Sequence, residues 1–263
     1  MKLFFPLLLA MLISSSLHAQ DNYEIQVYGS QTMAKGATMI ELHSNFTFGG
    51  RQYIEDGVLP THNILHETIE ITHGFNDWLE TGFYFFNAIG SDNRTTYVGS
   101  HIRPRVMAPQ SWHWPVGVSL SAEVGYQKRA YSPDDWSLEI RPIIDKTWGK
   151  FYVAFNPVFD RSLHGAGIND GFQFAPNVKV SYGFFKLVAL GFEYYGGLGN
   201  PTQITPAQNQ EQQLFLAADF NLPSDWELNI GYGLGFTPVT DNDIFKVILG
   251  YRIHKQSKNA GQK

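Results

Sequence analysis

Basic side chains recur at every second position in one segment of the sequence. His101, Arg103 and Arg105 alternate there with apolar or proline residues. Successive side chains of an extended strand point to opposite faces, so this spacing predicts that the three side chains lie in one row. We regard the row as the first candidate for contact with a polar solute.

Other polar side chains occupy the corresponding phase of further segments. They are Glu139, Arg141, Asn156, Asn177, Lys179 and Glu227. If the opposite phase faces lipid, this phase faces the lumen of a barrel, where opposite charges across a narrow bore would create a transverse field that orients polar solutes. The alternative is that these side chains pair with one another and fill the interior, because a barrel of about twelve strands encloses a narrow space.

The patterns of common catalytic and metal sites are missing from the sequence. His66 and Glu67 begin like the zinc motif H-E-x-x-H, but Glu70 stands where the second histidine would be. Two histidines four residues apart share a face only on a helix, and this segment has the pattern of a strand. There is no G-x-S-x-G pattern and no phosphate-binding loop. We therefore predict no catalytic residue, no metal site and no cofactor.

Long strands are needed to position these residues, and the sequence has the required alternation. Apolar residues alternate with small or polar ones over residues 116–126, 151–159 and 226–236. Such runs exceed the usual strand of about five or six residues and match the roughly 9–11 residues with which a tilted strand crosses a membrane. The mature chain has no run of 18 apolar residues, which excludes helical membrane spans.

Twelve such segments divide the chain. The predicted spans are residues 39–48, 64–75, 78–89, 95–107, 116–127, 136–146, 150–160, 171–183, 185–196, 211–222, 225–237 and 243–254. Connections after odd-numbered segments are mostly long and polar, and those after even-numbered segments are mostly tight, except 109–115. Long outer loops and short periplasmic turns are typical of outer-membrane barrels. The predicted fold is all-β, an antiparallel transmembrane barrel of about twelve strands with both termini in the periplasm.

Most of the tryptophans fall at the tight turns. Trp78, Trp112, Trp114, Trp148 and Trp226 do so, whereas Trp136 falls at the other end. Amphipathic rings gather where a bilayer meets water, so this distribution predicts a periplasmic aromatic girdle. The alternative is that tryptophans pack near turns, as in a soluble β-protein.

The first residues have the form of an export signal. Lys2, an apolar run over residues 4–13 and a small-residue cleavage site ending at Ala19 predict a signal peptide. The predicted divisions are residues 1–19 as signal peptide, 20–38 as a segment that adds a strand, plugs the bore or trails in the periplasm, 39–254 as the barrel and 255–263 as a polar tail.

The composition agrees with a lipid-facing β-protein. Charged residues make up 16% of the chain, below the usual figure of about 25%. Aromatic residues make up 15%, and there are 25 glycines. The absence of cysteine excludes disulfides and an ordinary lipid anchor, and the net charge of −5 argues against nucleic acid as a partner.

One hairpin resembles a known family. Residues 67–86 read ETIEITHGFNDWLETGFYFF, with acidic-apolar alternation, Gly, Asp, an aromatic residue and Leu-Glu-x-Gly. This pattern resembles the transporter barrels linked to phenol-degradation (meta-pathway) genes, and it covers about a twelfth of the chain. The resemblance implies an outer-membrane channel for small organic compounds, apolar or aromatic ones among them, and brings no catalytic residues.

Four prolines lie inside predicted strands. Pro104, Pro142, Pro157 and Pro176 fall in the lipid-facing phase at similar heights. Each removes a backbone donor, which sheets normally tolerate only at edges and bulges. Two hypotheses follow: a lateral exit by which an apolar solute enters the membrane, or bulges that shape the wall.

The function that these patterns favour is an outer-membrane passage for small solutes. The alternatives are a non-conducting barrel that works through its outer loops and a lipid-modifying enzyme. The expected partners are the bilayer, lipopolysaccharide (through divalent cations on the acidic outer loops), a small solute and the barrel-assembly machinery.

The last strand departs from the usual assembly signal, a terminal aromatic residue, since residues 251–254 read YRIH and a polar tail follows.

Overall fold

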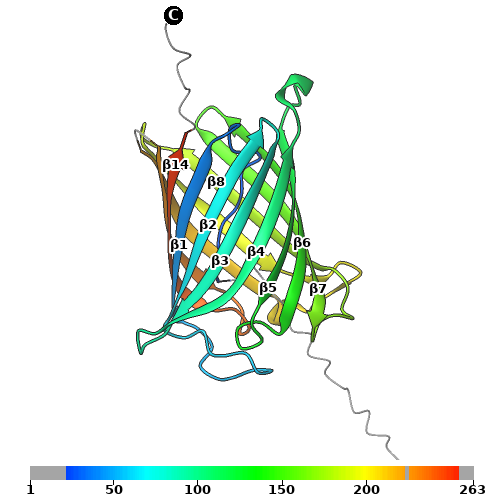
Figure 1. Ribbon diagram of the computed structural model, residues 1–263. Helices are drawn as coiled ribbons and strands as arrows, with labels where there is room; N and C mark the ends of the chain where they lie inside the picture. Colours follow the sequence, from blue (N-terminus) through cyan, green and yellow to red (C-terminus); the bar gives the residue numbers. More distant parts are fainter. Residues whose placement is uncertain (1–21, 223–224, 255–263) are drawn as a thin grey trace, which may run out of the picture.

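The computed structural model describes residues 22–222 and 225–254, which form a closed antiparallel β-barrel of twelve long strands (Figure 1). The predicted signal peptide and the predicted polar tail lie outside the described residues. The long strands are β1 (Thr38–Gly49), β2 (Ile64–Asn76), β3 (Leu79–Ile89), β4 (Thr95–Met107), β5 (Gly117–Gln127), β6 (Asp134–Trp148), β7 (Phe151–Gly165), β8 (Gln173–Gly183), β9 (Val188–Gly197), β12 (Glu211–Asn221), β13 (Trp226–Gly235) and β14 (Asn242–Ile253).

Short elements occupy two of the connections. The β9–β12 loop contains strands β10 (Gly199–Asn200) and β11 (Gln203–Ile204) and the 3₁₀ turn η2 (Ala207–Asn209), and η1 (Gln110–Trp112) lies between β4 and β5. No helix of the described chain is long and apolar enough to span a membrane.

The sheet closes on itself. Most long strands pair with their neighbours along the chain, and β14 returns to pair with β1, so that Thr38 lies opposite Ile253. β9 pairs with β12 across the two short strands, with Val188 opposite Phe220. Every long strand thus has a partner on both sides, which leaves no open sheet edge. The predicted fold class, an antiparallel barrel of about twelve strands, is confirmed.

The wall is polar inside and apolar outside. On β1, Ile40 and Leu42 point outward and are each 42% exposed, whereas His43 points inward and is 0% exposed. The same alternation runs along β2, where Ile69 is exposed and Thr68 and Glu70 are buried. A soluble barrel would hide its apolar face, but here that face is the outer surface. This arrangement is the one that a lipid environment stabilises.

β6 and β7 extend beyond their predicted spans of 136–146 and 150–160. Their ladder continues until Asp134 lies opposite Gly165. The Asp134 carboxylate accepts hydrogen bonds from Ser162 Oγ at 2.8 Å and from the Gly167 amide at 2.9 Å. These side-chain bonds hold the hairpin beyond the region of apolar alternation, which is why that alternation did not predict the extra length.

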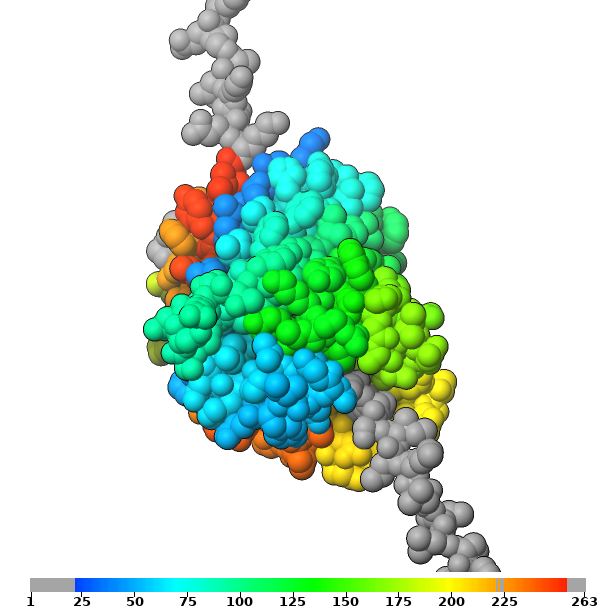
Figure 2. Space-filling view, turned by 60° about the horizontal axis from the view of Figure 1, so that its bottom comes forward, coloured from blue at the N-terminus to red at the C-terminus, as the bar shows by residue number. Residues whose placement is uncertain are grey.

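The two ends of the barrel differ. At the short-turn end, tight turns join β2 to β3, β6 to β7 and β8 to β9, and β1 begins and β14 ends there. At the long-loop end, the residues between β1 and β2 lie across the barrel, coloured light blue in Figure 2. The Leu59 amide in this loop donates to the Ala130 carbonyl in the β5–β6 loop at 2.8 Å. These two loops therefore contact each other at the long-loop end.

The tryptophans named above are exposed on the outside. Five of them lie at the short-turn end, next to or within the connections there, and are between 43% and 57% exposed: Trp78, Trp112, Trp114, Trp148 and Trp226. The Trp226 ring packs 4.7 Å from the Tyr251 ring, measured between centroids. Trp136 lies at the long-loop end, where its ring is 5.7 Å from that of Tyr126.

The two ends of the described chain lie at opposite ends of the barrel. The side-chain amide of Asn22 donates to Asp241 at 2.7 Å, in the loop between β13 and β14. Asn22 is therefore at the long-loop end, whereas β14 ends at Ile253 at the short-turn end. The predicted location of both termini in the periplasm concerns residues outside the described ones. Within the described chain, residues 22–37 pass through the barrel before β1 begins.

The strand prolines interrupt the wall's hydrogen bonding. In the described β6–β7 ladder no pair lies between Ile140–Phe159 and Ile144–Phe155, the stretch that contains Pro142 and Pro157. Pro157 itself lies opposite Pro176 on β8. Proline has no amide proton to donate, so the backbone ladder is locally thinned at one height across β6, β7 and β8.

Candidate functional site: the lumen and its N-terminal segment

Residues 22–37 run through the lumen as an extended chain that joins no strand, drawn in dark blue in Figure 1. We call this stretch the lumen segment. Ile25 and Val27 pack in an apolar cluster with Tyr195 and Phe215. Tyr23 packs in a second cluster, and its ring lies 5.4 Å from that of Phe86. These clusters hold the segment by apolar contact within an otherwise polar interior.

The backbone of the lumen segment is satisfied by side chains of the wall. Asn156 exchanges two hydrogen bonds with Tyr28: the Tyr28 amide donates to Asn156 Oδ1 at 2.8 Å, and Asn156 Nδ2 donates to the Tyr28 carbonyl at 3.0 Å. Arg105 donates to the carbonyls of Gly29 at 3.0 Å and Gln31 at 2.7 Å. The wall's own backbone groups are used in its ladder, so inward side chains must supply the partners that a buried backbone requires.

Three arginines surround one ring of the lumen segment. The guanidinium carbons of Arg103, Arg141 and Arg105 lie 4.2, 4.9 and 5.8 Å from the centre of the Tyr28 ring. These distances are those of cation–π contacts. The Tyr28 hydroxyl donates to Glu24, four residues earlier in the same segment. Tyr28 is therefore the point at which the segment meets the basic side of the lumen.

Each of these arginines also has a carboxylate partner. Arg103 Nη2 donates to Glu70 at 2.8 Å, Arg105 Nη2 lies 2.7 Å from Glu80, and Arg141 Nη2 donates to Glu139 at 2.7 Å. Arg103 and Glu70 are 2% and 1% exposed. These pairs compensate the charges of the arginine row inside the barrel.

A second ion-pair network lies on β8, β9, β12 and β14. Lys179 Nζ lies 3.1 Å from Glu193 and 2.7 Å from Asp219. Lys246 also pairs with Glu193, and it donates to the Ile25 carbonyl of the lumen segment at 3.1 Å. This network therefore also holds the lumen segment, through the bond from Lys246 to the Ile25 carbonyl.

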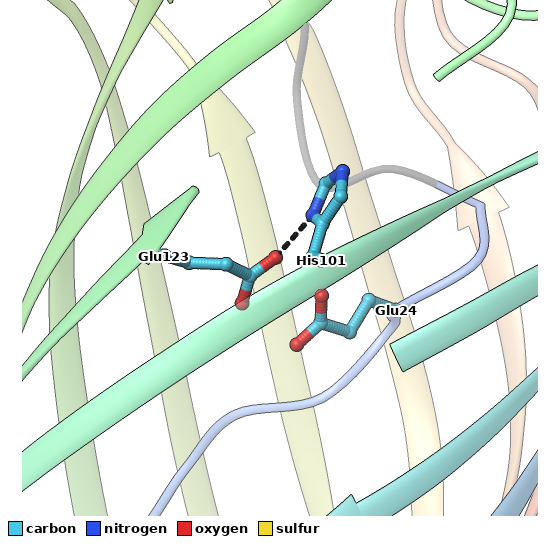
Figure 3. Close-up of side chains that lie close together, drawn as sticks. All are labelled: Glu24, His101 and Glu123. Atoms are coloured by element: carbon cyan, nitrogen blue, oxygen red, sulfur yellow. Dashed lines mark hydrogen bonds and ion pairs between the residues drawn. The ribbon is translucent and has the colours of Figure 1, made fainter. Parts of the chain in front are cut away.

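His101 joins a carboxylate cluster rather than the arginines next to it in the sequence. Its Nδ1 hydrogen-bonds to Glu123 on β5, and Glu24 of the lumen segment reaches the same place (Figure 3). The potential ligand atoms of Glu24, His101 and Glu123 all lie within 4.8 Å of one another. The cluster ties the lumen segment to the β4–β5 wall.

The other candidates from the sequence divide into buried and exposed residues. Asn156 and Asn177 are buried and lie directly opposite each other on β7 and β8. Glu139 and Lys179 are largely buried within the ion pairs described above. Glu227 is different, because its side chain is 52% exposed at the short-turn end, where it pairs with Arg252. Glu227 therefore lies at the mouth of the barrel, where it lines the same cavity as Arg103 and Arg105.

Several residues of the lumen were missed by the sequence analysis. Glu70, Glu80, Glu123 and Glu193 point inward from β2, β3, β5 and β9 and complete the ion pairs. The alternation that selected the basic residues would have selected these acids if it had been applied to every strand. Nothing in the sequence indicated that Tyr28 would lie in the lumen. The lumen segment pairs with no strand, so alternation along a strand does not predict where its side chains point.

A cavity remains between the lumen segment and the wall near the short-turn end. Its volume is about 470 Å³. The residues that line it are Gln26, Val27, Tyr28, Gly29, Gln31, Thr32, Met33, Ala34, Met39, Glu41, Glu70, Thr72, Glu80, Arg103, Arg105, Glu227, Arg252 and His254. Nearly half of this lining belongs to the lumen segment, so the position of that segment decides the size of the space.

The acidic residues of the long loops are used within the loops. Glu55 lies 2.9 Å from Arg51 in an ion pair, and Asp241 accepts hydrogen bonds from Asn22 and from Thr61 Oγ1, the latter at 2.8 Å. Asp135 lies 3.3 Å from Arg129. These bonds show that the three carboxylates stabilise the conformation of the loops.

Comparison with known proteins gives a fold and no family. No protein-family model matches the sequence. No curated protein matches it either. Among solved structures, the COG4313 outer membrane channel from Pseudomonas putida F1 is similar over 87% of this chain and 99% of that chain, with a TM-score of 0.54 and 13% identity. The KdgM porin is similar over 82% of this chain and 99% of that chain, with a TM-score of 0.52 and 13% identity. KdgM in complex with disordered oligogalacturonate gives a TM-score of 0.53 at 11% identity.

These similarities and the apolar outer wall lead to one conclusion. At such low identity the shared feature is the fold alone. The outward apolar side chains of the described strands are those that a bilayer would contact. The chain has the fold of the outer-membrane β-barrels to which it is similar.

Proposed function

We propose that this barrel is a channel for small solutes whose bore is set by the lumen segment. The observation that carries the proposal is the cavity of about 470 Å³, which lies between residues of the segment and of the wall near the short-turn end. A passage narrowed in this way would admit small molecules and exclude large ones. The similarity to outer-membrane channels and porins supports the same proposal.

The charges of the lumen favour solutes of low net charge. Arg103, Arg105 and Arg141 each have a carboxylate within ion-pair distance. An acidic oligosaccharide of the kind that the KdgM porin holds would have to displace these carboxylates. Small organic solutes, apolar or aromatic ones among them, would pass without breaking the pairs. The partner molecules we propose are therefore such solutes, together with the surrounding bilayer and lipopolysaccharide.

The second candidate function is a barrel that conducts nothing. The observation that favours it is the lumen segment itself, which crosses the interior and is bonded to the wall by Asn156, Arg105 and Lys246. In this alternative the long loops would be the working part. The two proposals differ in what the purified protein does in a membrane.

Conductance in a planar bilayer tests the two proposals. The full chain is compared with Tyr28→Ala, which removes the ring that the arginines surround. A small stable conductance in the full chain that rises in the variant supports the channel. If both proteins leave the bilayer insulating, and liposomes that contain them stay impermeable to small uncharged sugars, the non-conducting barrel is the correct function.

A further inference from the structure

Two carboxylates and one imidazole meet on the inner face of β1 and β2. Glu41 and Glu70 lie directly opposite each other across the two strands, and His43 follows Glu41 by two residues on the same inward face. The potential ligand atoms of these three side chains all lie within 4.8 Å of one another. Period-two spacing on one strand and an opposed residue on the next are enough to bring three donors to one point.

The imidazole of His43 has an unexplained environment. The side chain is 0% exposed, and neither ring nitrogen makes a hydrogen bond within the described part of the protein. Glu70 Oε2, which faces it, also makes none. His43 Nε2 and Glu70 Oε2 face each other as an ion pair at 3.4 Å, without a hydrogen bond between them. Buried polar atoms nearly always have a hydrogen-bond partner, so two facing atoms without one indicate a further ligand between them. If position 43 only had to fill space, an apolar or small residue would fit there without burying two polar atoms.

The charges at this point also require compensation. Like charges directly opposite on neighbouring strands are destabilising. Arg103 and Thr72 donate to Glu70 Oε1, at 2.8 and 2.6 Å, and leave Oε2 turned toward His43. Glu41 has no ion pair among the described residues. A cation between Glu41, His43 and Glu70 would offset the repulsion and use the free lone pairs.

The spacing of the donors suits a transition-metal ion. Two donors that are each roughly 2.1 Å from a tetrahedral ion lie roughly 3.4 Å apart. His43 Nε2 and Glu70 Oε2 are 3.4 Å apart, which is also too unfavourable an arrangement to form a hydrogen bond here. Imidazole nitrogen with carboxylate oxygen is a ligand set for Zn²⁺ and similar ions, whereas Mg²⁺ and Ca²⁺ prefer oxygen alone.

We propose that Glu41, His43 and Glu70 bind one divalent transition-metal ion of the Zn²⁺ type. Arg103 and Thr72 would orient the Glu70 carboxylate from behind. Glu41 and Glu70 both line the cavity beside the lumen segment, so the ion would be reached from the short-turn end and would keep an open coordination position toward that cavity. This site was not expected from the sequence, where the short H-E-x-x-H test found no metal motif. It does not depend on whether the barrel conducts.

Zinc binding by the purified full-length protein tests the proposal. The protein is stripped with a chelator in detergent, dialysed against Zn²⁺ in the presence of excess Mg²⁺, and its metal content is measured. We expect one Zn²⁺ per chain, with affinity at least about 100-fold weaker in His43→Gln and in Glu41→Gln, since even outer partners of a metal site are worth about 10–100-fold. Glu67→Gln on the outward face of β2 is the matched control and should bind like the unmodified protein.

Folding of each variant is checked by the heat-dependent gel mobility of the barrel. His43 makes no hydrogen bond within the described residues, so His43→Gln removes only its 3.4 Å ion pair with Glu70. A rise in the thermal unfolding midpoint of the unmodified protein on adding Zn²⁺ provides a readout that needs no variant. The proposal is wrong if the unmodified protein binds no zinc, or if His43→Gln keeps it. It is also wrong if Glu123→Gln alone loses zinc, which would assign the ion to the cluster in Figure 3.

Discussion

Asn156 on β7 pairs with Tyr28 of the lumen segment as one strand residue pairs with another. The side-chain amide accepts from the Tyr28 amide at 2.8 Å and donates to the Tyr28 carbonyl at 3.0 Å. Asn156 is 0% exposed, so water does not compete for either bond. The Asn156 side chain therefore replaces a neighbouring strand as the hydrogen-bond partner of the Tyr28 backbone, because the backbone groups of the wall are already paired with one another.

Asn156→Leu should release the middle of the lumen segment. Two buried backbone groups of Tyr28 lose their partners, each at a cost of about 1–3 kcal/mol. We expect faster amide hydrogen exchange in residues 22–37 and a larger conductance, measured on protein in detergent and in a planar bilayer. Asn87→Ala, which removes an amide on the outside of the wall, should change neither quantity. Equal exchange in Asn156→Leu and the unmodified protein would show that the apolar clusters alone hold the segment.

Arg103→Met should destabilise the barrel because it leaves Glu70 buried without its cation. Breaking a buried ion pair on one side costs about 3–5 kcal/mol. The same substitution at Arg252, whose pair with Glu227 is exposed, should cost less than about 1 kcal/mol. Both are measured by urea unfolding in the presence of lipid or detergent. Similar losses for the two variants would mean that Arg103 is hydrated in the lumen and that the pair is not truly buried.

Gly74→Ala should displace the end of the lumen segment. A Cβ atom at position 74 would lie 2.4 Å from the carbonyl oxygens of both Met33 and Ala34, a distance at which the backbone must move. Gly183→Ala is the control, since the nearest atom to its Cβ would be 3.7 Å away. We expect protease cleavage within residues 30–37 for the first variant and not for the second. Resistance of both to cleavage would show that the wall, rather than the segment, adjusts.

Replacing Pro142, Pro157 and Pro176 by valine tests the lateral-exit hypothesis. Pro142→Val and Pro157→Val restore backbone donors in the unpaired stretch of the described β6–β7 ladder, and Pro176→Val restores one opposite Pro157 on β8. If apolar solutes leave sideways through this thinned wall, their uptake into cells that carry the triple variant should fall severalfold, while uptake of small polar solutes stays the same. Unchanged uptake of apolar solutes leaves the prolines as wall-shaping residues only. Pro104→Val, on β4 and away from this group, serves as the comparison.

The barrel could be predicted because its signals are local. Alternation over segments such as 116–126 reports which side chains face lipid, and the tight turns report where strands reverse, so strand number and order follow without knowledge of distant contacts. The strand prolines were also visible in the sequence, and their outward phase agrees with the structure. β6 and β7 were underestimated because side-chain bonds to Asp134 extend their ladder beyond the alternating region.

The interior could be predicted only in part. Arg103, Arg105, Arg141 and Glu139 were found because they alternate within strands. The partners Glu70 and Glu80 were not found, because they lie on β2 and β3 in a register that tertiary pairing sets. Glu227 lines the same cavity as Arg103 and Arg105, but its side chain is 52% exposed, and the alternation of side chains along a strand does not predict such exposure at the mouth. His101 was assigned to the arginine row, and the structure joins it instead to Glu123 and Glu24.

The sequence by itself determined an antiparallel barrel of about twelve strands with a polar interior and an apolar outer surface, because period-two alternation is a property of each strand alone. Only the tertiary structure decided that residues 22–37 cross the lumen and that their first described residue lies at the long-loop end. It also decided that Glu41, His43 and Glu70 converge at one point. These features depend on closure of the sheet and on contacts between residues far apart in the chain, such as Lys246 with Ile25, and no local pattern encodes such contacts.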